Sequence, residues 1–336
     1  MLRRRLSPSF VAVLFSGLVG GAAALAAAPV EVRVGFFMTR LHQVDFSGNQ
    51  YSFEGFLWFQ WDTNRWGQVM GSGLAGEAVR GPHQTVEVMG AMEGFEQQEA
   101  QEKPGYACLK LRGRVSNPWD VRQFPFDQQQ LLLTVEDASY ESDKVSYVLD
   151  AANSGVDEAL GVPGWEPGPL TAVRSEHTYA STYGDPDLRT GEGSTYSRAT
   201  FVLSIAREGW AYGLKVFVGM LVSVGIGFCS LFIRPVDVDP RFGLGVGALF
   251  GVVGSEYVVS NIMPDSGRFS LADGLHCLSL VIVLLLIIIS TLSLRLWHSH
   301  ETEGPLRSRA FDRRWLFILL AFYVCGYLLQ LQFFLR

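Results

Sequence analysis

The sequence predicts an all-β, immunoglobulin-like sandwich over residues 27–208, followed by a bundle of four membrane-spanning helices over residues 209–336. Between residues 30 and 207, apolar and polar positions alternate with period two, and no apolar run is long enough to cross a bilayer. The composition changes at Glu208, after which long uncharged runs follow one another. The β part holds 25 Asp and Glu against 14 Lys and Arg, which argues against a nucleic-acid partner.

Residues 1–26 have the pattern of a secretory signal peptide. Three arginines at 3–5 precede a short apolar stretch that ends in ALA (24–26), and a signal peptidase accepts such small residues. An uncleaved membrane anchor is the alternative. In both cases we expect the β part to be exported to the periplasmic or extracellular side of the cell (inner) membrane.

Short strands separated by turn residues predict the sandwich. The clearest strand patterns lie at residues 30–34, 56–61, 131–135 and 200–205. Clusters of Gly, Pro, Asn and Asp interrupt them at a spacing that suits about ten strands in two sheets. Of the four cysteines, Cys108 alone lies in this part, so no disulfide can form within it.

We expect the four helices at about 210–233, 241–263, 269–297 and 312–335. Three of them contain uncharged runs of 18, 21 and 21 residues, close to the roughly 20 residues that span a bilayer. The second contains Glu256 and five glycines, so it is the least suited to face lipid. Five arginines between 295 and 314 indicate a cytoplasmic loop, so the C-terminus lies on the same side as the β part.

The second helix carries a stripe of residues that is neither strongly apolar nor charged. Its members are separated by three or four positions, and they are Gly243, Gly247, Phe250, Gly254, Tyr257 and Asn261. One interpretation is a helix-packing face, because Gly243, Gly247 and Gly251 repeat the small-xxx-small pattern. The other is the wall of a pore, and spacing alone favours neither.

The segment QFPFDQ (123–128), preceded by WDVR (119–122), resembles the central signature of pentameric ligand-gated ion channels, the Cys-loop receptor superfamily. Further similarities extend the resemblance over the expected mature chain. They are Trp61 with Arg65, Gly164 with Trp165, Tyr196 eleven residues before Arg207, and the separation of Asp239 from Pro264. Asn117 and Leu131 stand where eukaryotic members have cysteines, as is usual in prokaryotic members. Residues 67–94 lack the family's Trp-x-Pro-Asp motif, and Gly219 stands near its usual proline.

The resemblance implies a homopentamer in which the second helix of each subunit lines a central pore for inorganic ions. Phe250 would form the hydrophobic gate. Asp239, with Asp237 adding to it, would form an acidic ring that selects cations. Pro240 and Arg241, however, are similar to a motif of anion-conducting members, and both aspartates have the alternative of lying in an ordinary solvated turn.

The resemblance also implies a contact that couples the sandwich to the pore. Arg207 would pair with Asp127 and with an acid from the first hairpin, Asp45. Pro125 lies in the same motif as Asp127. The loop that receives the motion would contain Pro264, Asp265 and Arg268.

Ligand recognition in the resembled family takes place between subunits, in an aromatic pocket. The matching positions are Phe56, Tyr140, Tyr183 and Tyr196. Aromatic side chains of a sandwich also commonly fill its core, which is the alternative for each. An amine, an amino acid, a peptide or a proton could be the agonist.

Two other classes of function were weighed. A non-conducting, membrane-anchored sensor would keep the same fold and bind its partner through the sandwich. An enzyme is not expected, because the six histidines are scattered, no metal-spaced His/Cys cluster occurs and no Gly-rich phosphate loop precedes a helix. We therefore expect no metal and no cofactor, and membrane lipid, ions and a small agonist as partners.

Overall fold

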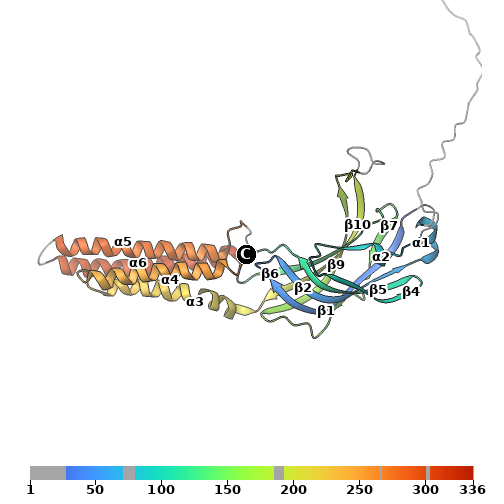
Figure 1. Ribbon diagram of the computed structural model, residues 1–336. Coiled ribbons are helices and arrows are strands. Elements are labelled where there is room, and N and C mark those ends of the chain that lie inside the picture. The colour runs from blue at the N-terminus through green and yellow to red at the C-terminus, as the bar shows by residue number, and fades with distance from the viewer. Residues whose placement is uncertain (1–27, 71–79, 185–192, 265–266, 300–302, 336) are drawn as a thin grey trace, which may run out of the picture.

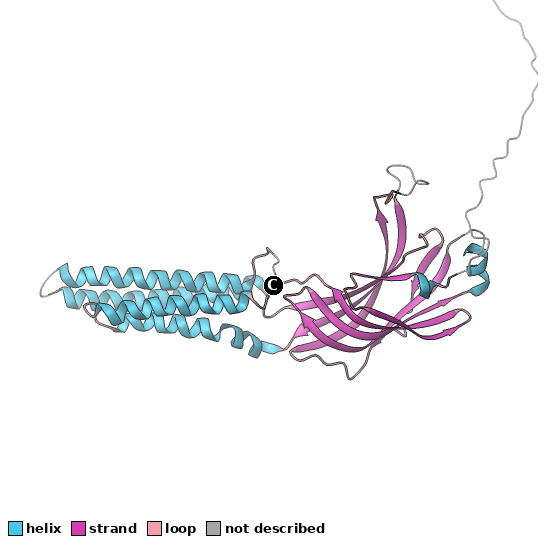
Figure 2. Cartoon of the chain, viewed as in Figure 1, coloured by secondary structure: helices cyan, strands magenta, loops and turns pink. Residues whose placement is uncertain are grey.

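The computed structural model describes residues 28–70, 80–184, 193–264, 267–299 and 303–335. The expected signal peptide lies outside these ranges. The molecule is elongated, with a β part at one end and a bundle of long helices at the other (Figure 1, Figure 2). β10 ends at Arg207 and the first long helix begins at Gly209, so the chain passes directly from one part to the other.

Within the described residues, the β part is a sandwich of two sheets. One sheet has the order β4-β5-β2-β1-β7, with β8 paired to β1, and the other has the order β3-β6-β10-β9. The strands are β1 (Val30–Asp45), β2 (Gln50–Trp61), β3 (Val86–Met89), β4 (Glu96–Lys103), β5 (Tyr106–Ser116), β6 (Gln128–Asp137), β7 (Val145–Leu149), β8 (Gly155–Val156), β9 (Trp165–Tyr179) and β10 (Ser194–Arg207). The predicted sandwich is confirmed, although the short helices α1 (Thr63–Met70) and α2 (Pro82–Thr85) were not expected.

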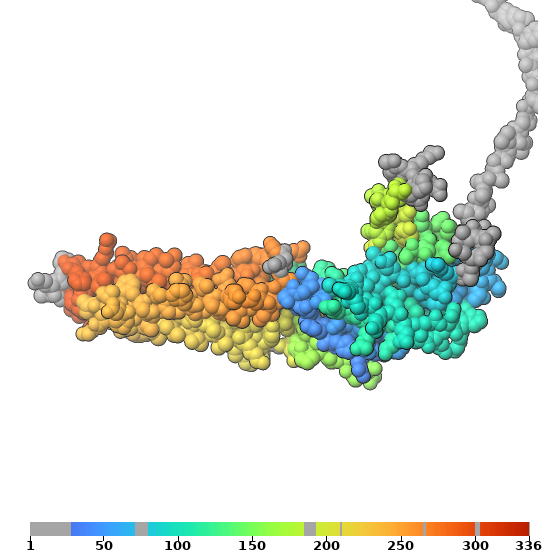
Figure 3. Space-filling model, in the orientation of Figure 1, coloured from blue at the N-terminus to red at the C-terminus, as the bar shows by residue number. Residues whose placement is uncertain are grey.

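The alternating residues of facing strands form the core of the sandwich. Phe36 on β1 is fully buried, and its ring lies 5.7 Å from Phe53 on β2 and 5.5 Å from Phe201 on β10. Because β10 belongs to the other sheet, these rings join the two layers. β9 and β10 continue beyond the layers as a hairpin whose outer end stands clear of the sandwich (Figure 1, Figure 3).

Four described helices are long and apolar enough to cross a membrane, which fits a multi-pass membrane protein. They are α3 (Gly209–Cys229), α4 (Val238–Ser260), α5 (Leu271–Ser299) and α6 (Gly304–Phe334), with a short 3-10 turn, η1 (Ser230–Phe232), after α3. The start expected at 312 for the last helix is wrong, because α6 begins at Gly304. Pro305 suits the first turn of a helix. In the polar turns that follow it, Ser308 and Asp312 are buried while Arg307 is exposed, so this part of α6 is an amphipathic helix.

A buried ion pair connects helices of the bundle at the end distant from the sandwich. The Arg241 side chain on α4 is fully buried, and its Nη2 lies 2.8 Å from Oδ1 of Asp312 on α6. Its Nη1 donates to Asp312 Oδ2 at 3.0 Å and to the carbonyl oxygen of Ile233 at 2.8 Å. The pair therefore holds α4, α6 and the segment after η1 together.

Replacing Asp312 by Asn should destabilise the bundle, because Arg241 would keep its charge without a counter-charge. Breaking a buried ion pair from one side typically costs about 3–5 kcal/mol. We expect a clearly lower midpoint of thermal unfolding for Asp312→Asn in detergent. Arg313→Gln changes an exposed neighbour on the same helix and is the control. Equal midpoints for the two variants would contradict the assignment.

Candidate functional site

The FPFD loop (residues 124–127) inserts between the sandwich and the helices. Phe124 is fully buried and packs with the core of the helix bundle, and the Phe124–Pro125 peptide bond is cis. The ring of Phe126 lies so close to Gly213 on α3 that a Cβ there would be 2.6 Å from its Cζ. The backbone N–H of Leu271, at the start of α5, donates to the carbonyl oxygen of Arg122 at 2.9 Å. The FPFD loop thus contacts α3, and the segment just before it is bonded to the start of α5.

Asp127 and Arg207 form an ion pair at this junction. Arg207 Nε donates to Asp127 Oδ1 at 2.8 Å, and Nη2 lies 3.4 Å from Oδ2. The Arg207 side chain is 7% exposed and the Asp127 side chain 1% exposed. The backbone N–H of Arg207 also donates to the Asp127 carbonyl oxygen at 3.2 Å, so the end of β10 is fastened to the loop twice.

Aromatic rings surround the Arg207 guanidinium. Among the described residues, the Cζ of Arg207 lies 4.2 Å from the ring centre of Trp165, 4.7 Å from Tyr212, 4.8 Å from Phe46 and 5.1 Å from Phe124. These rings come from β9, α3, the β1–β2 turn and the FPFD loop. Their faces attract a cation, which helps to offset the burial of the charge. Sequence reasoning predicted the ion pair but missed this cage.

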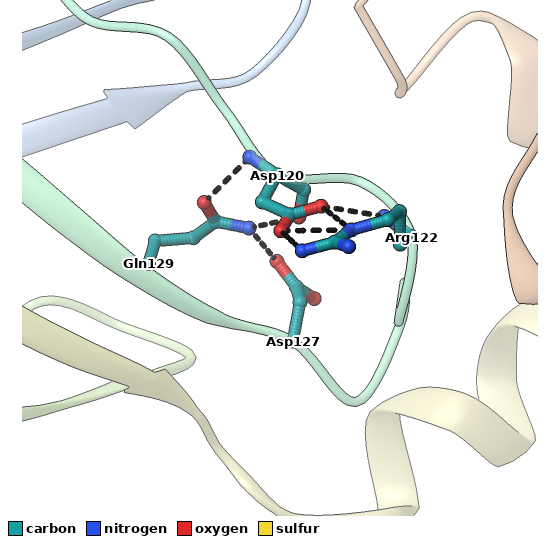
Figure 4. Close-up of polar contacts among 4 residues, drawn as sticks. All are labelled: Asp120, Arg122, Asp127 and Gln129. Atoms are coloured by element: carbon teal, nitrogen blue, oxygen red, sulfur yellow. Dashed lines mark hydrogen bonds and ion pairs between the residues drawn. The ribbon is translucent and has the colours of Figure 1, made fainter. Parts of the chain in front are cut away.

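A hydrogen-bond network continues from Asp127 along the loop (Figure 4). Gln129 Nε2 donates to Asp127 Oδ2 and to the Asp120 carbonyl oxygen, each at 2.7 Å, and Gln129 Oε1 accepts from the Asp120 N–H at 3.0 Å. The Asp120 carboxylate in turn pairs with Arg122. The Arg122 hydrogen bond lowers the pKa of Asp120, and the charge of Arg268 adds to the effect. The α4–α5 connection therefore acts electrostatically on this loop.

The predicted pairing of Asp45 with Arg207 is wrong. Asp45 instead accepts hydrogen bonds from its own turn, from the Gly48 N–H at 2.9 Å, Ser47 Oγ at 3.0 Å and Gln50 Nε2 at 2.9 Å. The bond from Gln50 is the largest cause of its lowered pKa. The β1–β2 turn reaches Arg207 through Phe46. Pro264, which follows α4 in the chain, is buried, and Asp265 lies outside the described residues.

Two of the expected ligand-binding tyrosines meet at the β9–β10 hairpin, around a third that the sequence analysis missed. The ring centre of Tyr179 lies 5.8 Å from Tyr196 and 5.9 Å from Tyr183. Tyr179 Oη donates to Glu136 Oε1 at 2.9 Å, and Arg198 pairs with the same carboxylate. Burial is the main cause of the raised pKa of Tyr179 and of Tyr196. An aromatic patch with an internal ion pair therefore lines the hairpin.

Tyr140 and Phe56 form no ring contact with this patch among the described residues. The ring of Tyr140 contacts Trp66 on α1 at 5.6 Å. Phe56 is half-buried on β2, where it pairs with Phe37 and Lys110 in the sheet that does not contain the hairpin. The segment that follows Tyr140 is bonded to β10 beside Tyr196, because the Ser142 N–H donates to the Thr195 carbonyl oxygen at 2.7 Å. Phe56 is therefore the member of the predicted set that lies in the other sheet of the same subunit.

The predicted stripe forms the open face of α4. All six of its residues are exposed, and the Phe250 side chain is 71% exposed. A Cβ added at Gly243, Gly247 or Gly254 would meet nothing within 4 Å, whereas one at Gly251 would overlap Ser223 of α3. The small-xxx-small pattern is thus divided between two faces. Within the chain, Gly251 packs against α3, whereas the glycines of the stripe pack against no other helix.

The charged residues at the start of α4 differ in their surroundings. Asp239 is exposed four residues before Gly243 and extends the stripe. Asp237 pairs with Arg234, whose Nε lies 2.8 Å from Asp237 Oδ2. Arg241 is buried and neutralised by Asp312, away from the stripe. The charge at this end of the open face is therefore that of Asp239.

Part of the chain is similar in sequence to a known receptor subunit. No protein-family model matches the chain. A stretch of 149 residues, 44% of the chain, is 28% identical to the neuronal acetylcholine receptor subunit alpha-9 of Gallus gallus, and it spans 28% of that subunit's length. Together with a sandwich followed by four membrane-capable helices, this similarity is consistent with the Cys-loop receptor fold.

Replacing Arg207 by Lys should weaken the junction although the charge is kept. Lysine lacks the planar fork that bonds both carboxylate oxygens and stacks on rings. Each lost hydrogen bond to a charged group costs about 1.5–3 kcal/mol, so we expect a lower midpoint of thermal unfolding in detergent. Arg122→Lys makes the same change in an exposed pair and should leave the midpoint unchanged. An Arg207→Lys variant as stable as the control would show that the cage has little effect.

Proposed function

We propose that the chain is the subunit of a homopentameric, cation-conducting, ligand-gated channel of the prokaryotic type, with its sandwich outside the inner membrane. The open face of α4 carries this proposal. The exposed side chains of α6, such as Phe317 and Phe333, are large and apolar and suit lipid. The open face of α4 instead combines one large apolar residue, Phe250, with glycines, Tyr257 and Asn261, and this mixture suits a water-filled pore with a hydrophobic constriction.

The connection between ligand site and pore follows β10. This strand extends from Tyr196 in the hairpin to Arg207 in the aromatic cage, a length of about 36 Å at about 3.3 Å per residue, with one register shift against β9 between Leu203 and Ile205. α3 begins two residues later and packs against α4. A movement of the hairpin can therefore reach α3 through β10 and the FPFD loop, and from α3 it can reach the pore face of α4.

The proposed agonist site lies between two subunits. Tyr183 and Tyr196 of one subunit, with Tyr179, would form one wall, and Phe56 of a neighbouring copy would complete it from the other sheet. Tyr140 would lie at the edge of this site. The guanidinium of Arg198 already lies 5.7 Å from the Tyr179 ring centre, so an agonist would bind mainly to Tyr183 and Tyr196.

Recording from the reconstituted protein under a salt gradient tests the function. Steps of pH and a panel of small amines should evoke currents that reverse towards the cation equilibrium potential. Reversal towards the anion potential would contradict the selectivity but not the channel. Silence from confirmed pentamers would favour a non-conducting sensor of the same fold.

Replacing Phe250 by Ala should increase the current in the absence of agonist. A ring of large apolar side chains closes a pore by excluding water, and Ala removes most of that ring. The measurement is the conductance without agonist, normalised to the amount of protein in the bilayer. Phe317→Ala makes the same change on α6 and should leave this conductance at the wild-type level. Equal conductance in both variants would place the gate elsewhere.

Replacing Asp239 by Asn should reduce the preference for cations. Five copies of this exposed carboxylate would raise the local cation concentration at the cytoplasmic entrance. We expect the reversal potential under a salt gradient to move towards zero. Asp237→Asn is the matched control and should have a smaller effect, because Arg234 already neutralises Asp237. Identical potentials in both variants and the wild type would exclude Asp239 from selection.

A further inference from the structure

A histidine and two glutamates meet at the edge of the sandwich. His83 lies on α2, and Glu99 and Glu102 lie on the edge strand β4. Their potential ligand atoms all lie within 4.8 Å of one another. The His83 side chain is only 2% exposed, whereas that of Glu102 is 49% exposed. The cluster therefore combines one buried imidazole with two carboxylates that can adjust from the solvent side.

An irregularity in β4 brings the two carboxylates to the same side. In a regular strand, residues three apart point to opposite faces of the sheet. The pairing of β4 with β5 shifts register between Glu99 and Gln101, which adds a residue to the strand at this point. Glu99 and Glu102 can therefore both approach His83. This arrangement cannot be recognised from sequence spacing, which is why no metal site was expected.

The imidazole of His83 is held in place but has no hydrogen-bond partner among the described residues. Its ring stacks on Trp61, with 5.9 Å between the ring centres. Gly81 also lies close to the ring, because a Cβ there would be 2.8 Å from Nδ1. Nε2 lies 3.5 Å from Glu102 Oε1, and neither ring nitrogen forms a hydrogen bond. A buried, unbonded nitrogen that faces two carboxylates is suited to a cation.

We propose that His83, Glu99 and Glu102 bind a divalent transition-metal ion of the Zn²⁺ class. Zn²⁺ takes nitrogen and carboxylate oxygen at about 2.0–2.2 Å, so neighbouring tetrahedral ligands are about 3.3–3.6 Å apart. The separation of His83 Nε2 from Glu102 Oε1 already lies in this range. The exposed Glu99 would complete three ligands by a side-chain movement. The imidazole distinguishes this set from the all-oxygen sets that Ca²⁺ and Mg²⁺ prefer.

The ion would fasten α2 to the edge of the sheet. β4 is exposed along its whole length, and in the chain it pairs only with β5 among the described strands. A shared ion would add a connection from β4 to α2 and, through the stacked Trp61, to the end of β2. This role is independent of the proposed channel function and stabilises the sandwich whether or not the protein conducts ions.

The test uses the full chain in detergent, purified with a tag that lacks histidine and treated with a chelator. Titration with ZnCl₂ by calorimetry should reveal a site in the wild type that is lost or more than about tenfold weaker in His83→Ala and Glu99→Gln. ZnCl₂ should also raise the midpoint of thermal unfolding of the wild type but not of these variants. Glu96→Gln, an exposed change on the same strand, should behave as the wild type.

Glu99→Gln keeps the test decisive if His83→Ala fails to fold, because Glu99 is exposed. Wild-type Zn²⁺ binding in Glu99→Gln would overturn the proposed ligand set. Absence of binding to the wild type would overturn the site itself. Tighter binding of CaCl₂ than of ZnCl₂ to the wild type would overturn the assignment to a transition metal.

Discussion

The arrangement of the two parts depends on the compensation of one buried charge. A guanidinium removed from water is costly unless a carboxylate, hydrogen bonds and polarisable groups replace its hydration. At Arg207 these come from Asp127 and from rings on β9, α3, the β1–β2 turn and the FPFD loop. Moving any one of these segments alone would remove part of the compensation and leave the buried guanidinium less stabilised. The end of β10 and the start of α3 therefore behave as one rigid connection.

A second buried arginine has the corresponding effect at the far end of the bundle. Arg241 is paired with Asp312 and bonded to the carbonyl oxygen of Ile233, so α4 is held there by α6 and by the chain after η1. Near the sandwich, the backbone N–H of Leu271 binds the start of α5 to Arg122, two residues before the FPFD loop. α4 is therefore held at the end far from the sandwich, and α5 at the end near it. On α4, the exposed glycines Gly243, Gly247 and Gly254 have no neighbouring side chain within the chain.

The parts of the fold that follow local patterns could be predicted from the sequence, and the contacts between distant segments could not. Period-two alternation and uncharged runs indicate strands and spanning helices directly. The pairing of Asp127 with Arg207 came from resemblance to a known family. The aromatic cage around Arg207 was not predicted, because its rings lie on segments that are far apart in the sequence. The pairing of Asp45 was predicted wrongly because residues of its own turn already donate hydrogen bonds to its carboxylate. The burial of Arg241 could not be predicted, because nothing in the neighbouring sequence indicates it.

The surroundings of the α4 glycines bear on the choice between a packing face and a pore wall. Glycine favours close helix contact only where another helix fills the space that it leaves, as Ser223 does at Gly251. Gly243, Gly247 and Gly254 have no such neighbour within the chain. Facing lipid, they would leave backbone beside hydrocarbon without packing, next to the exposed carboxylate of Asp239. Water in a pore surrounded by further copies of α4 would hydrate both the backbone and the carboxylate, and this environment is the one that the residues of the open face suit best.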